Sequence, residues 1–157
     1  FVESVTLRVP RRGDTLHFDQ LQPVEFDLAL RLWSRQFPDR PLRIEPQLHI
    51  NGSLAPLEKA SQAQINGLPV KLADLGQANW QELALVSLQI LRNEPHARQV
   101  QIKRRVFLDS TELHVMPVLE DCYWVSCLKT HDCVDSRELG YIPRSWIRGV
   151  AIRLRRS

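Results

Sequence analysis

Apolar and polar residues alternate at every second position through much of this chain, and this alternation constrains its fold more than any other feature. It runs through the segments VTLRV, PLRIEPQLHI, VQIKRRVFL, ELHVMPVLE, CYWVSCLK and GVAIRL. Because successive side chains of a β-strand point to opposite faces, a period of two is typical of half-buried strands. Asn51-Gly52 and Asn66-Gly67 are turn dipeptides, since both residue types tolerate a positive φ. The pattern predicts a strand-rich chain.

Residues 23–37 fit two periods at once. They alternate like a strand, but four large side chains also recur at helical spacing: Phe26, Leu30, Trp33 and Phe37. Pro23 suits the first turn of a helix, and the segment has almost no β-branched residues, so we expect a helix here. Residues 51–76 are rich in Gly, Pro, Ala, Ser and Gln, and we expect a loop with one short helix over residues 57–64.

Residues 77–91 are equally ambiguous. Asn79, followed three residues later by Glu82, is a capping box of the kind that begins a helix. The second half, ALVSLQI at residues 84–90, also alternates. A family resemblance described below implies a strand at this position, and we therefore expect a strand over residues 84–90.

The length and charge of the chain set broad limits. It has 157 residues, of which 43% are hydrophobic, enough to bury one sizeable core or two small ones. No apolar run approaches the roughly 18 to 20 residues of a membrane-spanning helix, so we expect no membrane span. The net charge of +3 is uneven: residues 111–140 hold six acids against two basic residues, and residues 141–157 hold five arginines and no acid.

Three cysteines and a histidine lie close together as Cys122, Cys127, His131 and Cys133. These are zinc-ligand types, but their C-x4-C-x3-H-x-C spacing fits no familiar zinc pattern. A zinc site, a disulfide across a hairpin and free thiols are the three alternatives, and we favour free thiols with no metal or other cofactor. The odd number of cysteines argues against a secreted disulfide framework and favours a cytoplasmic location.

Familiar catalytic signatures are absent from the sequence. It contains no G-x-S-x-G elbow, no H-E-x-x-H and no glycine-rich phosphate loop followed by lysine. Its five histidines are scattered along the chain. We therefore expect a protein that is not an enzyme and assign no catalytic residue.

The order of residues between positions 112 and 152 carries the most specific signal. It contains in turn Val118-Leu119, Glu120-Asp121, Tyr123-Trp124, Gly140-Tyr141-Ile142-Pro143 and Ser145-Trp146-Ile147. This order resembles the second half of a Src-homology-3 domain, which is a small five-stranded barrel. The resemblance implies such a barrel over about residues 84–156, with its first strand near residues 85–90. Residues 1–80 resemble no family that we can name.

The predicted fold is thus mainly β, or β-rich α+β, and is divided into two modules. Residues 1–80 form a strand-rich module with one or two short helices, and residues 84–157 form a Src-homology-3-like barrel. Of the one large core or two small cores that the chain length allows, this division predicts two small cores.

The same segment suggests a binding groove. Tyr123 and Trp124 are neighbours in a strand and should point to opposite faces, while Pro143 ends strand pairing and Trp146 follows in a short 3₁₀ turn. The resemblance implies that Tyr123 or Trp124, with Pro143 and Trp146, lines a groove for a polyproline II peptide. It also implies that acids beside the groove, namely Glu112, Glu120 and Asp121, pair with a basic ligand residue.

Two functional readings follow from the sequence. The first is a non-catalytic protein–protein interaction module, an adaptor or scaffold that binds another protein, a peptide or a larger assembly. The second is a nucleic-acid-associated small β-barrel that uses the basic segments 103–105 and 148–156 with exposed aromatics for stacking. The acidic stretch at residues 111–140 counts against the second reading. Tyr123, Trp124 and Trp146 would have no binding role if they were core residues of another small barrel.

Overall fold

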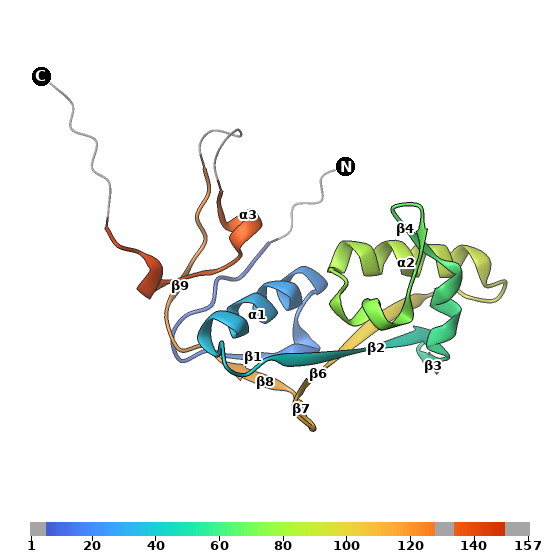
Figure 1. Ribbon diagram of the computed structural model, residues 1–157, viewed down its shortest axis with the longest axis horizontal. Coiled ribbons are helices and arrows are strands. Elements are labelled where there is room, and N and C mark those ends of the chain that lie inside the picture. The colour runs from blue at the N-terminus through green and yellow to red at the C-terminus, as the bar shows by residue number, and fades with distance from the viewer. Residues whose placement is uncertain (1–5, 128–133, 150–157) are drawn as a thin grey trace, which may run out of the picture.

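A four-stranded antiparallel sheet organises the molecule. The computed structural model describes residues 6–127 and 134–149, and within them the chain has a mixed α+β fold (Figure 1). The sheet has the strand order β3-β2-β6-β7. Its strands are β2 (Leu42–Ile50), β3 (Ser53–Ala55), β6 (Val100–Leu108) and β7 (Thr111–Leu113). β2 and β6 pair along their whole length, from Leu42 opposite Leu108 to Ile50 opposite Val100.

Short elements complete the fold. Three two-stranded sheets pair β1 (Thr15–His17) with β8 (Val115–Pro117), β4 (Gln64–Ile65) with β5 (Leu68–Pro69), and β9 (Cys122–Tyr123) with β10 (Ile142–Pro143). The helices are α1 (Pro23–Gln36), α2 (Trp80–Asn93) and α3 (Ser136–Leu139). The 3₁₀ turns are η1 (Phe18–Gln20), η2 (Leu57–Gln62), η3 (Leu72–Gln77) and η4 (Arg144–Trp146).

The predicted turns are confirmed. Asn51 and Gly52 adopt φ values of 51° and 80° and connect Ile50 to its partner Ser53 in a two-residue hairpin. Positive φ at both central positions is what the right-handed twist of a hairpin favours, and Asn and Gly tolerate it best. Asn66 and Gly67 make the corresponding turn between β4 and β5. The short helix expected over residues 57–64 is present as η2.

The helix predicted over residues 23–37 is confirmed as α1. Pro23 occupies its first turn, and Gln22 and Glu25 form a capping box at its start. One face of α1 packs into a first core, whose buried residues are Phe18, Phe26, Leu28, Ala29, Leu32, Trp33, Val106, Met116, Val118, Cys122 and Tyr141. The helical spacing of large apolar side chains therefore overrides the alternation in this segment.

The strand predicted over residues 84–90 is wrong, because this segment lies in α2. Asn79 Oδ1 accepts a hydrogen bond from the Glu82 N–H at 2.9 Å, and Glu82 Oε2 accepts one from the Asn79 N–H at 3.0 Å. This closed capping box satisfies two backbone N–H groups that the start of a helix otherwise leaves without partners. The buried side chains of α2 join a second core, formed by Leu48, Ala60, Ala63, Val70, Leu75, Leu83, Val86 and Ile90.

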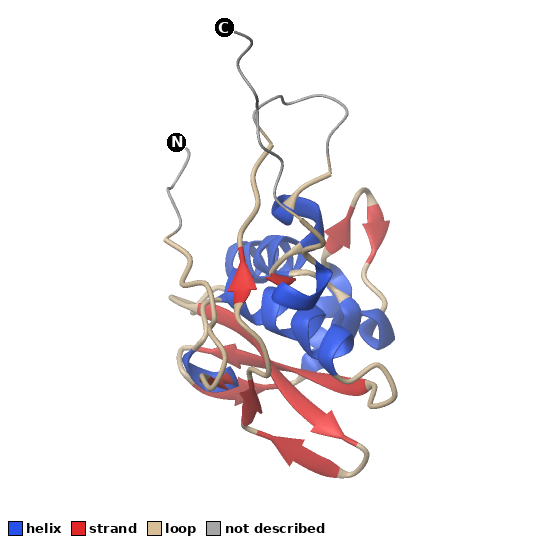
Figure 2. Cartoon of the chain, turned by 90° about the vertical axis from the view of Figure 1, so that its left-hand side faces the viewer, coloured by secondary structure: helices blue, strands red, loops and turns tan. Residues whose placement is uncertain are grey.

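Both helices cover one face of the β2–β6 ribbon, α1 over one half and α2 over the other (Figures 1 and 2). The ribbon runs through both cores, since Ile44 packs against the first and Ile50 against the second. Each core combines residues from both sides of the predicted boundary at residues 80–84. The described residues form several small sheets and no closed barrel, so the broad α+β class is confirmed and the five-stranded barrel stays a hypothesis.

Other predicted strands are shorter in the structure. Residues 6–10 have no assigned strand, and in the described part of the segment CYWVSCLK, residues 122–127, the paired residues are Cys122 and Tyr123. The strand predicted within residues 149–154 lies outside the described residues from residue 150 onward. None of the helices in residues 6–127 and 134–149 combines the length and apolar character needed to cross a membrane.

Candidate protein-interaction site

Three of the residues predicted to line a groove come together around the β9–β10 pair. Tyr123 lies opposite Ile142 and Cys122 opposite Pro143, and η4 with Trp146 follows directly. Tyr123 is 41% exposed and Trp146 is 51% exposed, whereas Pro143, opposite Cys122, is buried. We call Tyr123, Pro143 and Trp146 the aromatic site. Within the described residues this segment forms the β9–β10 pair and η4 and is not part of a closed barrel.

Tyr123, the last residue of β9, and Trp124, which follows the strand, lie in different environments. Trp124 is half-buried and packs edge-on against Tyr141, with ring centroids 6.1 Å apart. Tyr141 is buried, donates a hydrogen bond from its hydroxyl to the Arg8 carbonyl at 3.1 Å, and has its pKa raised to about 12 by burial. Trp124 therefore belongs to the packing of the first core, and Tyr123 is the outward aromatic.

Arg35 of α1 fixes the position of Trp146. Its guanidinium carbon lies 4.8 Å from the centre of the Trp146 ring, within the range of a cation–π contact. The same guanidinium donates to the carbonyl of Tyr141 at 2.8 Å and to the carbonyl of Leu139. These three contacts join α1 to the chain on both sides of β10, so Trp146 is presented from a braced position.

The two predicted acids of the site have structural partners. Glu120 accepts hydrogen bonds from the Ser145 N–H at 3.2 Å and the Ser145 hydroxyl at 2.8 Å, which holds η4 against the start of β9. Asp121 accepts one from the Arg12 N–H at 3.0 Å. Glu112 lies elsewhere, on β7, and pairs with Arg105 at 2.6 and 2.9 Å. Glu120 and Asp121 are therefore placed to shape the aromatic site.

Exposed apolar residues are concentrated in the stretch of sequence that contains the aromatic site. Of the twelve large hydrophobic residues exposed in the described part of the chain, seven fall between residues 119 and 147. They are Leu119, Tyr123, Val125, Val134, Leu139, Trp146 and Ile147. The aliphatic members were missed by sequence reasoning, because isolated apolar residues beside turns look the same whether they end up buried or exposed.

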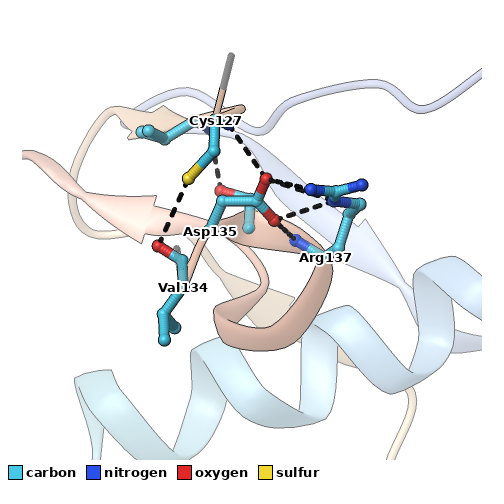
Figure 3. Close-up of polar contacts among 6 residues, drawn as sticks. Cys127, Val134, Asp135 and Arg137 are labelled. Atoms are coloured by element: carbon cyan, nitrogen blue, oxygen red, sulfur yellow. Dashed lines mark hydrogen bonds and ion pairs between the residues drawn. The ribbon is translucent and has the colours of Figure 1, made fainter. Parts of the chain in front are cut away.

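Asp135 closes the segment between β9 and α3 (Figure 3). Its buried carboxylate accepts hydrogen bonds from the Cys127 N–H at 3.0 Å and from the N–H and side chain of Arg137 at 2.9 to 3.1 Å. These bonds, led by those from the Arg137 side chain, hold the pKa of Asp135 well below its usual value. The Ser136 hydroxyl also accepts from the Val125 N–H at 2.8 Å, so the two sides of the segment are firmly joined.

The two described cysteines, Cys122 and Cys127, differ in oxidation state. Cys122 is a buried free thiol, and burial, followed by the charges of Glu120 and Asp121, raises its pKa to about 11. Cys127 is disulfide-bonded, so the expectation of free thiols is right for Cys122 and wrong for Cys127. Cys133 and His131 lie outside the described residues. Within the described ranges no three His, Cys, Asp or Glu side chains are grouped to hold a metal ion.

A second surface, which sequence reasoning missed, lies between α2 and β6. A groove of about 720 Å³ is lined on one side by Ala84, Ser87, Leu88 and Leu91 of α2 and on the other by the length of β6 from Val100 to Val106. Phe18 and Leu21 line it near α1, as does His114 after β7. The groove exists because α2 is a helix packed on the sheet, so a prediction of a strand at residues 84–90 could not reveal it.

The basic segment 103–105 is largely neutralised within the molecule. Arg104 pairs with Asp27 and lies 4.3 Å from the ring centre of Phe26, and Arg105 pairs with Glu112. Lys103 is exposed and has no ion pair within the described part of the chain. Of the other predicted basic segment, 148–156, only Arg148 and Gly149 lie within the described residues.

No protein-family model, curated protein or solved structure matches this chain. Its function therefore has to be argued from the two surfaces described above.

Proposed function

We propose that this chain is a non-catalytic protein–protein interaction module that binds a partner through the aromatic site. The observation that carries the proposal is the exposure of Tyr123 and Trp146 on a braced scaffold. Exposed aromatics that are held rigidly supply large contact areas at a low entropic cost, and Tyr and Trp are enriched among the residues that dominate binding. We extend the proposal to an adaptor or scaffold role, as the sequence suggests.

The polar contacts around Trp146 hold its side chain in a position where a partner could contact it. Arg35 makes three contacts to hold Trp146 and its neighbours, and Glu120 uses both carboxylate oxygens to hold η4. A tryptophan that had no partner would be expected to pack into the adjacent core, where its apolar area is removed from water. Here its ring stays 51% exposed against the Arg35 guanidinium.

We further propose an extended, proline-rich segment as the ligand. The Src-homology-3 resemblance suggests this class, and polyproline II peptides are recognised by flat aromatic surfaces because they need little ordering. The nucleic-acid alternative has less support. Arg104 and Arg105 already pair with Asp27 and Glu112, which leaves Lys103 as the one basic side chain of segment 103–105 without an ion pair.

An array of proline-rich peptides probed with the full chain tests the proposal. We expect the wild type to retain a subset of peptides and the Tyr123→Ala and Trp146→Ala variants to lose them. Leu54→Ala is the control, because Leu54 is also a large exposed apolar residue, at 69%, but lies on β3, at the other end of the molecule. The proposal fails if no peptide is retained, or if folded Tyr123→Ala and Trp146→Ala proteins retain every peptide. Salt-dependent binding of single-stranded DNA instead would favour the alternative.

A further inference from the structure

We propose that the open edge of β6, between Val100 and Arg104, accepts an extended segment of a partner protein as an additional strand. The segment is apolar at alternate positions and acidic at a position between them. This site is separate from the aromatic site and does not depend on the function proposed there.

The backbone of β6 has unused hydrogen-bonding groups on one edge. The Asn51 N–H donates to the Gln99 carbonyl at 2.8 Å, which shows that the odd-numbered residues of this strand direct their N–H and C=O groups towards β2. In an antiparallel ladder the residues between them point the other way. β7 pairs with β6 only at Val106–Leu108, so the groups of Val100, Ile102 and Arg104 face an edge that no described strand occupies.

The groove provides room beside this edge. Its α2 wall includes Ala84, Ser87, Leu88 and Leu91, which recur at helical spacing and form one stripe next to the buried face of the helix. Leu88 remains 43% exposed in this wall. A strand laid along β6 would cover that side chain and the apolar surface around it, and would extend the sheet in line with β7.

The two faces of β6 set the chemistry of the incoming strand. Val100 and Ile102 point to the helix side, where they pack partly against the second core. Side chains of the added strand that point to the helix side would contact apolar surface and the α2 wall of the groove, so they should be apolar. Lys103 points to the opposite face and is exposed without an ion pair in the described contacts, whereas Arg105 is paired with Glu112. An acidic residue on that side would therefore complement Lys103.

The same charges disfavour a second copy of this chain as the occupant. Pairing β6 with itself would bring two copies of the basic run Lys103 to Arg105 alongside each other, and like charges facing across strands are destabilising. Exposed lysines also protect sheet edges from unwanted pairing. A partner strand with an acidic residue opposite Lys103 can pair with the same lysine that would repel a second copy of the chain.

The test uses fluorescence anisotropy with the full chain and a labelled seven-residue peptide that alternates valine and glutamate. The same peptide, N-methylated at alternate amides, lacks the donors that a strand needs, and we expect its affinity to be lower by about tenfold or more. Leu88→Glu should weaken binding of the unmodified peptide to a similar degree. Leu85→Glu is the matched control, because Leu85 is also 43% exposed on α2 but does not line the groove, and it should leave binding unchanged.

A charge exchange tests the role of Lys103. Lys103→Glu should lower the affinity for the valine–glutamate peptide and raise the affinity for a valine–lysine peptide. If the lysine only protects the edge from pairing, the substitution should not reverse which of the two peptides binds more tightly. Trp146→Ala should leave all of these affinities unchanged, which separates this site from the aromatic site. The inference is overturned if the unmodified peptide does not bind, if N-methylation has no effect, or if Leu85→Glu and Leu88→Glu weaken binding equally. It is also overturned if size-exclusion chromatography shows a dimer that Leu88→Glu dissociates.

Discussion

Asp27 of α1 and Arg104 of β6 form an ion pair whose side chains are 16% and 6% exposed. The second carboxylate oxygen of Asp27 accepts a hydrogen bond from the Trp80 N–H at 2.7 Å, at the start of α2. The Arg104 guanidinium also lies over the ring of Phe26. One carboxylate thus connects both helices to the central ribbon, at the boundary between the two cores.

Removing this carboxylate should destabilise the whole fold. Asp27→Ala leaves the Arg104 charge in a poorly solvated place, and breaking a buried pair in this way costs on the order of 3 kcal/mol. Urea unfolding followed by circular dichroism measures the loss. Asp27→Asn retains an acceptor for the Trp80 N–H and should lose less. A loss below about 1 kcal/mol for Asp27→Ala, as for an exposed pair, would show that the connection contributes little.

Residues 81–157 should not fold alone. Without residues 1–80, β6 loses β2 along its entire length, and the buried Met116 and Tyr141 lose the residues of α1 that share the first core. The isolated fragment should show no cooperative thermal transition and poorly dispersed amide resonances. A cooperative transition in the fragment would instead support the division into modules at residues 80–84 that the sequence suggests.

The stability of the fold should fall in acid partly through Asp135. Its pKa is depressed in the folded state, so its stabilising contribution is present above the unfolded-state pKa and decreases as the pH falls below about 4. Asp135→Asn should therefore have a lower melting temperature at pH 7 and a smaller further decrease between pH 5 and pH 3. Asp74→Asn, at an exposed position in η3, is the control and should follow the wild type. Parallel melting curves for wild type and Asp135→Asn across this range would contradict the assignment.

Cys122 should resist alkylation while the protein is folded. Its thiol is buried and its pKa is raised to about 11, so little thiolate is present at pH 8. Iodoacetamide labelling followed by mass spectrometry of the peptide that contains Cys122 should show slow modification in buffer and rapid modification in urea. Equal rates in the two conditions would mean that the thiol is accessible in the native fold.

Local signals in the sequence predicted local structure well. The Asn51-Gly52 turn, the place of Pro23 in the first turn of α1 and the long strands β2 and β6 depend on residues close together or on an unbroken alternating pattern. The error at residues 84–90 arose where a resemblance was preferred to the local cap formed by Asn79 and Glu82. The cap proved the better guide, because backbone donors at a helix start must be satisfied whatever the tertiary fold.

In the candidate sites, too, features set by local sequence could be predicted and features set by tertiary packing could not. The β9–β10 pairing sets Tyr123 opposite Ile142 and Cys122 opposite Pro143, and Trp146 follows in η4, so these residues are placed by one local stretch of chain. The bracing by Arg35 and the groove beside β6 depend on how α1 and α2 pack on the sheet. Contacts of that kind join distant parts of the chain and leave no pattern in any one segment. Sequence reasoning therefore found the aromatic residues but neither their support nor the open edge.

The central claim is that Trp146 contacts a partner, and NMR of the indole N–H groups tests it most directly. The full chain is titrated with the tightest proline-rich peptide from the array, and the Trp146 resonance is identified from its absence in Trp146→Phe. We predict that the Trp146 indole signal shifts with added peptide, while that of Trp33, which is buried and donates to the Arg40 carbonyl at 2.7 Å, does not. An unchanged Trp146 signal at saturating peptide, or equal shifts at Trp33 and Trp146, would contradict the account.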